Sequence, residues 1–217
     1  MKKVMLGAAV CAMAFSANAE DVVVVESART SAFNSIYAGA GIGGSFLKSD
    51  SEARYFDKDG NHQDKMKANR FIGSFVLGGG KVFSNNVYAG AELLMDWGKN
   101  KKFEIYDKSK KHTDDFSMKG FIPQIDAKVG YVFKNDALVY GKLGCAWSKV
   151  SGYDRSKDET SSKTKASVVL GLGAEKAFCK KFSTALEGDY NFGWKEDGFR
   201  FNKGWTVRAL VKYNVKY

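Results

Sequence analysis

Proline is almost absent from this chain: Pro123 is the only one in 217 residues. Proline-rich linkers and polyproline segments are therefore excluded. After the first twenty residues, long apolar runs are absent as well, and a membrane-spanning helix needs about 20 consecutive apolar residues. The chain is therefore neither a proline-rich linker protein nor a bundle of membrane helices.

Cysteine and histidine are also scarce. The cysteines are Cys11, Cys145 and Cys179, the histidines are His62 and His112, and their spacing matches no metal-binding pattern. We therefore predict no metal site and no cofactor. The expected layout places Cys145 toward one end of its strand and Cys179 in a turn at the other end. A disulfide needs Cα atoms within about 7 Å, so we predict two free thiols.

The first residues have the three parts of a secretion signal. Lys2 and Lys3 form its positive end, residues 4–17 form a short apolar run, and Ala17 and Ala19 supply the small residues of a cleavage site. We predict a signal peptide over 1–19 and a periplasmic N-terminal tail over 20–33. Removing Lys2 and Lys3 changes the formal charge from +10 to +8. For an exported chain, anionic lipid head groups are a better counter-charge than nucleic acid.

Strand-like alternation dominates the rest of the chain. Apolar and polar residues alternate with period two in eight runs, near 35–47, 69–82, 86–98, 117–133, 137–149, 164–178, 181–195 and 204–217. Short turns near 84–86, 134–136 and 179–181 alternate with long polar connections near 48–68, 99–116, 150–163 and 196–203. This plan predicts an all-β fold over 34–217, an eight-stranded antiparallel up-and-down transmembrane β-barrel. A soluble barrel of the lipocalin type has the same strand number but the opposite apolar face.

The aromatic residues indicate which face points outward. All four tryptophans lie on the apolar faces next to a long connection, and Tyr and Phe lie near the short turns. From Val87 to Trp97 is ten residues, which in a tilted strand rise about 25 Å, the height of the apolar band of an outer-membrane barrel. We predict two lipid-facing aromatic girdles, made of Trp97, Trp147, Trp194 and Trp205 at one end and Tyr131, Phe133, Phe178, Phe182, Tyr213 and Tyr217 at the other.

The polar face then becomes the lumen. It carries Arg70, Glu92, Asp96, Asp126, Lys128, Lys142, Glu175, Glu187, Asp189, Arg208 and Lys212. An eight-stranded interior is just wide enough for side chains to fill, and charges there are costly unless paired. We predict a salt-bridge network that plugs the lumen, with Glu187 and Lys212 as its best single pair. The alternative, in which water solvates these groups separately, implies a narrow pore.

Three stretches carry a family resemblance. They are "DVVVVESARTSAF" (21–33), "SIYAGAGIGGSF" (35–46) and "GWTVRALVKYNVKY" (204–217). The chain resembles the small outer-membrane β-barrel proteins of the porin-opacity type, which include alphaproteobacterial surface antigens and, more distantly, the membrane domain of outer membrane protein A. The resemblance implies a place in the bacterial outer membrane. It also implies that the assembly machinery recognises the closing strand by its terminal aromatic, here Tyr217.

Three functions are consistent with such a barrel. The first is a non-enzymatic surface protein whose four long loops support envelope integrity and contact lipopolysaccharide or host molecules. The second is a small conducting pore. The third is an enzyme that modifies lipid A, using His62 with Asp64 or His112 with Asp114. We predict the first and expect no catalytic residue.

Overall fold

A computed structural model describes residues 32–56, 62–106, 112–118, 120–134, 136–154, 159–179, 181–196 and 199–215. The predicted signal peptide, most of the predicted tail and Tyr217 lie outside these ranges. Within these ranges lie ten strands: β1 (Ser35–Phe56), β2 (His62–Val82), β3 (Val87–Gly98), β4 (Lys101–Tyr106), β5 (His112–Met118), β6 (Ile122–Phe133), β7 (Ala137–Asp154), β8 (Glu159–Ala177), β9 (Phe182–Glu196) and β10 (Phe199–Val215). In this part of the chain, no helix is long and apolar enough to cross a membrane.

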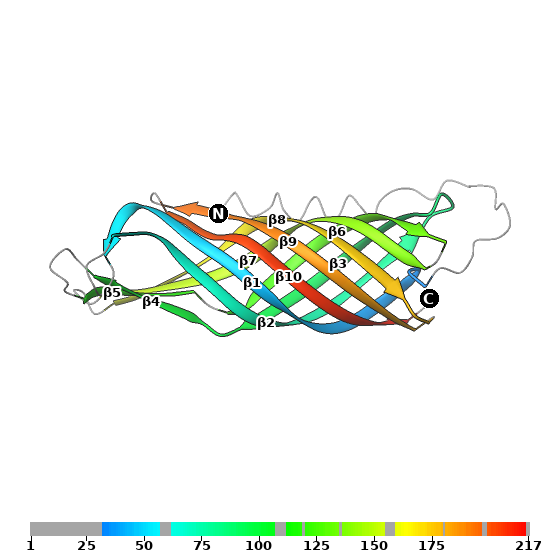
Figure 1. Cartoon of the computed structure of the whole chain (residues 1–217), viewed down its shortest axis with the longest axis horizontal. Helices are drawn as coiled ribbons and strands as arrows, with labels where there is room; N and C mark the ends of the chain where they lie inside the picture. Colours follow the sequence, from blue (N-terminus) through cyan, green and yellow to red (C-terminus); the bar gives the residue numbers. More distant parts are fainter. Residues whose placement is uncertain are drawn as a thin grey trace.

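Eight of the strands close into an elongated barrel (Figure 1). Each pairs antiparallel with the next in the order β1, β2, β3, β6, β7, β8, β9 and β10, and β10 pairs back with β1. The predicted eight-stranded antiparallel barrel is therefore confirmed. Because β10 pairs with β1 from Val215 onward, closure explains why the alternation continues almost to the end of the chain.

The tilt of the strands follows from their register. One row of paired residues runs from Phe46 through Trp205, Tyr190, Leu170, Leu143, Ala127, Ala91 and Gly79 to Ile36. The row therefore returns to β1 ten residues below its start, since 46 − 36 = 10. A stagger of ten over eight strands spaced about 4.8 Å apart corresponds to a tilt of about 40°.

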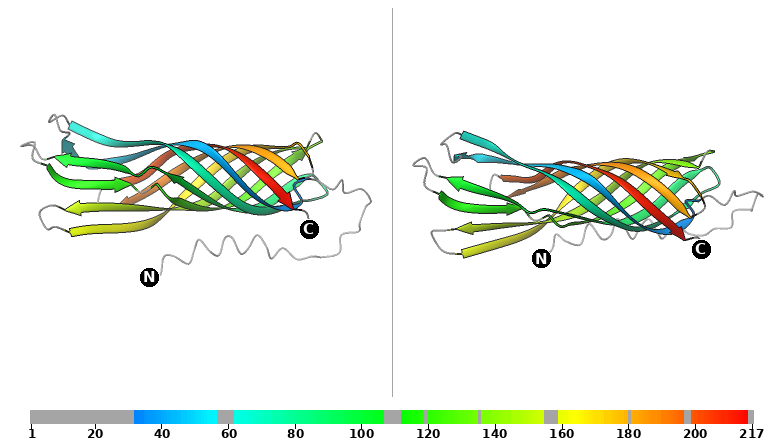
Figure 2. Two further views of the ribbon diagram at one scale, coloured as in Figure 1. Left: turned by 90° about the horizontal axis from the view of Figure 1, so that it is seen from below. Right: turned by 60° about the horizontal axis from the view of Figure 1, so that its bottom comes forward.

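The long connections are mostly strand, which the polar composition did not predict. Residues 101–106 and 112–116, expected to be loop, belong to the β4–β5 hairpin, and residues 117–118, expected to begin the next barrel strand, end β5 instead. Strands β1, β2, β7 and β8 also extend past their predicted ends. The hairpins project from one end of the barrel, opposite the short turns (Figure 2). β5 pairs with β7 over Met118↔Val150 to Asp114↔Asp154, so two neighbouring hairpins share one sheet. A polar segment still forms a strand when a neighbouring strand pairs with it.

The two faces of the wall differ as the alternation requires. Outward positions on the eight barrel strands carry exposed apolar side chains such as Phe71, Leu172 and Val211. Apolar side chains also fill both ends of the interior. Near the short turns, Ala32 and Phe33 are buried in a cluster with Tyr88 and Tyr140, so these two residues close the barrel floor rather than continue the predicted tail.

Candidate functional site

Charged side chains fill the middle of the lumen. Ten of the eleven predicted lumen residues are buried: Glu92, Asp96, Asp126, Lys128, Lys142, Glu175, Glu187, Asp189, Arg208 and Lys212. Each of the four buried bases lies within 4.0 Å of at least two carboxylates. Arg70, the eleventh, is half-buried on the inward face of β2, on the hairpin side of Ser74.

Glu187 is the central acceptor of this network. Its carboxylate lies 2.6 Å from Lys142 Nζ, 3.0 Å from Lys128 Nζ and 3.6 Å from Lys212 Nζ, and it also accepts a hydrogen bond from the Tyr140 hydroxyl. The predicted Glu187–Lys212 contact is therefore present, but it is the longest of the three. Glu187 joins strands β6, β7, β9 and β10 across the lumen.

Lys212 and Glu175 extend the network toward the short turns. Lys212 Nζ lies 2.9 Å from Glu175 and 3.3 Å from Glu92. Glu175 also accepts a 2.5 Å hydrogen bond from Ser183, which in turn accepts one of 3.1 Å from Asn214. Hydrogen bonds to the remaining carboxylate oxygen lower the cost of burying the charge.

Arg208 extends the network toward the hairpins. Its guanidinium donates to both oxygens of Asp96, with Nη2 at 2.6 Å and Nε at 2.9 Å from the nearer oxygens, and its Nη1 donates to Asp189. Ser74 donates to Asp96 at 2.6 Å. The planar guanidinium fork suits this paired recognition of carboxylates, which a lysine does not reproduce.

Gln124 links the last two carboxylates of the network. Its amide nitrogen lies 2.9 Å from both oxygens of Asp126 and 3.2 Å from Asp189. Lys142 Nζ completes this group, at 3.1 Å from Asp189 and 3.6 Å from Asp126. Side chains from seven barrel strands thereby form one connected network, and Tyr37 joins it from β1.

Two tyrosines belong to the same network and were missed by the sequence reading. Tyr37 donates to Glu92 at 2.8 Å, and its ring centroid lies 4.7 Å from Lys212 Nζ. The ring of Tyr140 lies against Gly173, where an added Cβ would approach the ring to 2.5 Å. The available signal is their inward position opposite glycine-rich strands, but the predicted lumen set contains only charged residues.

The buried charges of the lumen are nearly balanced in sign. The lumen contains six acids and five bases among the predicted residues, and the ten buried ones are in mutual contact. Within the described residues, no cluster of His, Cys, Asp and Glu is arranged to hold a metal ion. Among the described residues, Cys145 and Cys179 form no disulfide, and Cys145 is half-buried while Cys179 is exposed.

The aromatic residues lie outward at both ends, with one exception. Trp97, Trp205, Tyr131, Phe133, Phe178, Phe182 and Tyr213 are exposed on the outer surface, and Trp147 is half-buried at an outward position. Trp194 differs from the predicted girdle, because its indole N–H donates to the buried Ser148 hydroxyl at 3.3 Å. The preceding Gly193 has φ = 67°, a conformation open to glycine, which turns the strand at this point.

The two histidines lie at the tips of neighbouring hairpins. His62 pairs with Phe56, Phe56 pairs with Tyr106, and Tyr106 pairs with His112. Three strand spacings therefore separate the two histidines, about 14 Å between backbones. Their side chains lie outside the described residues. From Phe71, the last outward aromatic on β2, to His62 is nine residues, roughly 20 Å of tilted strand.

Comparison with known proteins agrees with this architecture. Residues 7–212 match the family model described as the outer membrane protein beta-barrel domain. The 31 kDa outer-membrane immunogenic proteins of Brucella melitensis biotype 1 and Brucella suis biovar 1 are each 31% identical over 204 residues, covering 86% of this chain and 85% of the relative. The solved structure of Ail, the attachment invasion locus protein of Yersinia pestis, matches with a TM-score of 0.48 and 14% identity, covering 83% of this chain and 99% of Ail.

The lipid-facing wall, the family match over most of the chain and the two relatives lead to one conclusion. The chain belongs to the outer membrane protein beta-barrel domain family and resides in the bacterial outer membrane.

Proposed function

We propose that this protein is a closed, non-enzymatic surface barrel that holds four β-hairpins at the cell surface for envelope integrity and surface contact. The observation that carries the proposal is the lumen itself. Its central layer is a fully buried ion-pair network in which Glu187 is 1% and Lys212 0% exposed. A barrel filled in this way is a rigid anchor, and its useful surface is the crown of hairpins.

The hairpin sequences favour anionic partners. The segment 99–116 contains six lysines and four acids and carries Phe103 and Tyr106 between them. Basic residues interleaved with aromatics suit phosphate groups of lipopolysaccharide or acidic host glycans. We propose these as partners, together with the outer-membrane assembly machinery, which would recognise the closing strand β10.

The geometry also bears on the two other candidate functions. The buried ion-pair network favours a closed barrel rather than a conducting pore. The position of His62 favours the surface barrel over the lipid A enzyme, because it lies nine residues beyond Phe71, the last outward aromatic on β2, which is roughly 20 Å of tilted strand. A catalytic dyad needs its groups within hydrogen-bond reach of each other and of the substrate.

Two measurements test the proposal. In planar bilayers the purified protein is expected to give no stable conductance steps, and regular steps would favour the pore. Cells that display the protein are expected to bind epithelial monolayers more strongly than cells that display a variant with the six lysines of 99–116 replaced by glutamine. Equal binding by the two would remove surface contact through this hairpin from the proposal.

A further inference from the structure

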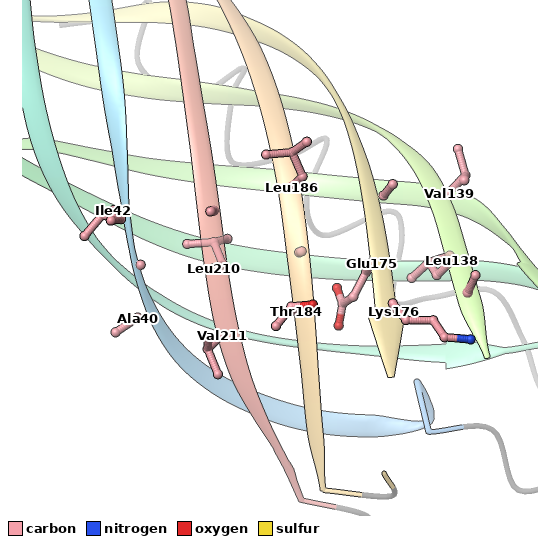
Figure 3. Close-up of a pocket in the computed structure, with 15 residues that line it drawn as sticks. Ala40, Ile42, Leu138, Val139, Glu175, Lys176, Thr184, Leu186, Leu210 and Val211 are labelled. Atoms are coloured by element: carbon pink, nitrogen blue, oxygen red, sulfur yellow. The ribbon is translucent and has the colours of Figure 1, made fainter. Parts of the chain in front are cut away.

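One side of the barrel's outer wall is hollowed. Two adjoining hollows of about 600 and 550 Å³ lie on it and share Val139, Ala174 and Leu186. The hollow of about 600 Å³ lies nearer the short turns and reaches across β7, β8, β9, β10 and β1 (Figure 3). Small side chains form the floor, including Ala174 and Ala209, while Leu172 and Leu186 stand at the rim with 72% and 61% exposure. Together these hollows form a lipid-facing groove.

Packing within the barrel wall does not require this groove. A Cβ added at Gly188 meets no atom within 4 Å, and one added at Gly141 meets only Leu172 at 4.0 Å. By contrast, inward glycines such as Gly173 lie directly against large side chains. Gly188 therefore leaves space on the membrane side that the fold itself does not require.

The height of the groove corresponds to one leaflet. On β8 it runs from Lys176 to Leu170, which is six residues. At about 3.3 Å per residue and a tilt of about 40°, this is roughly 15 Å, compared with an apolar band of about 25 Å. A partner that spans the membrane would use the full band, whereas a single acyl chain fits this length.

The charge at the lower end of the groove identifies the leaflet and the head group. Lys176 lines the groove beside the short turns. The described rim at that end carries Lys81, Lys134, Lys176 and Lys181 against one acid, Asp136. A basic rim attracts anionic lipid phosphates. A second copy of the chain in the same membrane would instead place two basic rims side by side at the same height.

We propose that this groove binds one acyl chain of an anionic phospholipid of the periplasmic leaflet, with its phosphate at Lys176. The inference goes beyond the proposed surface role and does not depend on it. The bound lipid would fill a depression in the wall and fix the barrel's orientation against that leaflet.

The test is native mass spectrometry of the full protein released from detergent micelles and titrated with phosphatidylglycerol. Gly188→Leu adds a side chain in the groove, at a position where its Cβ meets no atom within 4 Å. Gly79→Leu is the matched control, because Gly79 faces outward on β2 and its added Cβ makes only ordinary contacts, the nearest at 3.4 Å. We expect one retained lipid on the native chain, about tenfold weaker retention in Gly188→Leu, and no change in Gly79→Leu. Lys176→Gln is expected to reduce the preference for phosphatidylglycerol over phosphatidylethanolamine.

Heat-dependent gel mobility verifies that each variant is folded. Equal retention by Gly188→Leu and the native chain, or equal loss in Gly79→Leu, would overturn the proposal. The same spectra show whether a second copy of the chain, rather than a lipid, occupies the groove. If the native chain forms a dimer that cross-links through the exposed Cys179 and Gly188→Leu abolishes it, the groove is an interface between copies and the lipid assignment is wrong.

Discussion

Replacing Glu187 by alanine tests whether the lumen is held together by its ion pairs. The change removes two close contacts, at 2.6 Å to Lys142 and 3.0 Å to Lys128, and the acceptor of the Tyr140 hydroxyl. Hydrogen bonds to charged groups contribute about 1.5–3 kcal/mol each, and relief of the buried carboxylate offsets part of the loss. Removing one partner of a buried pair costs about 3–5 kcal/mol. We therefore expect the free energy of unfolding to fall by about 4 kcal/mol.

Urea unfolding in lipid vesicles, followed by circular dichroism and by heat-dependent gel mobility, measures this change. Glu187→Gln retains the size of the side chain and one acceptor, so its expected loss is about half as large. Leu186→Ala, at the next position but facing lipid, is expected to cost less than about 1 kcal/mol. If Glu187→Ala unfolded at the same urea concentration as the native chain, water would be solvating the lumen charges separately, and the reasoning for a plugged barrel would fail.

Three further predictions follow from the same geometry. Gly171→Ala is expected to lower the urea midpoint and Gly188→Ala to leave it unchanged, because an added Cβ approaches Lys142 Cε to 2.8 Å at the first position and meets nothing at the second. Trp194→Phe removes the indole hydrogen bond to β7 and is expected to cost about 1 kcal/mol in the same assay, and an unchanged midpoint would contradict an inward indole. In single-tryptophan variants, brominated lipid is expected to quench Trp205 strongly and Trp194 weakly, and equal quenching would place both in the girdle.

The wall of the barrel was predictable from the sequence because the alternation of apolar and polar residues within each strand distinguishes its two faces. Alternation from Val87 to Trp97 and from Trp205 onward defines which residues share a side, and the position of Trp97 and Trp205 next to long connections indicates that the apolar side meets lipid. The same alternation predicts which charged residues face the lumen. Ten of the eleven predicted lumen residues are buried, because period two holds wherever the strand stays regular.

The alternation does not predict local irregularities of a strand or the pairing between strands. Gly193 turns its strand, so Trp194 leaves the outward row that its position predicts. The β4–β5 hairpin forms in a polar segment because β7 is there to pair with it. Ala32 and Phe33 are buried because the barrel has an open floor, which the sequence of the tail does not indicate.

The sequence by itself determined the number of barrel strands, the outward apolar face and the identity of the lumen charges, since all three depend on residues close together in the chain. Only the tertiary structure decided which charges meet. The register of β9 and β10 places Arg208 opposite Glu187, yet Arg208 reaches Asp96 and Asp189 while Glu187 reaches Lys142 and Lys128 across the lumen. Those contacts arise from closure of the sheet, because residues far apart along the chain become neighbours only when the wall curves back on itself.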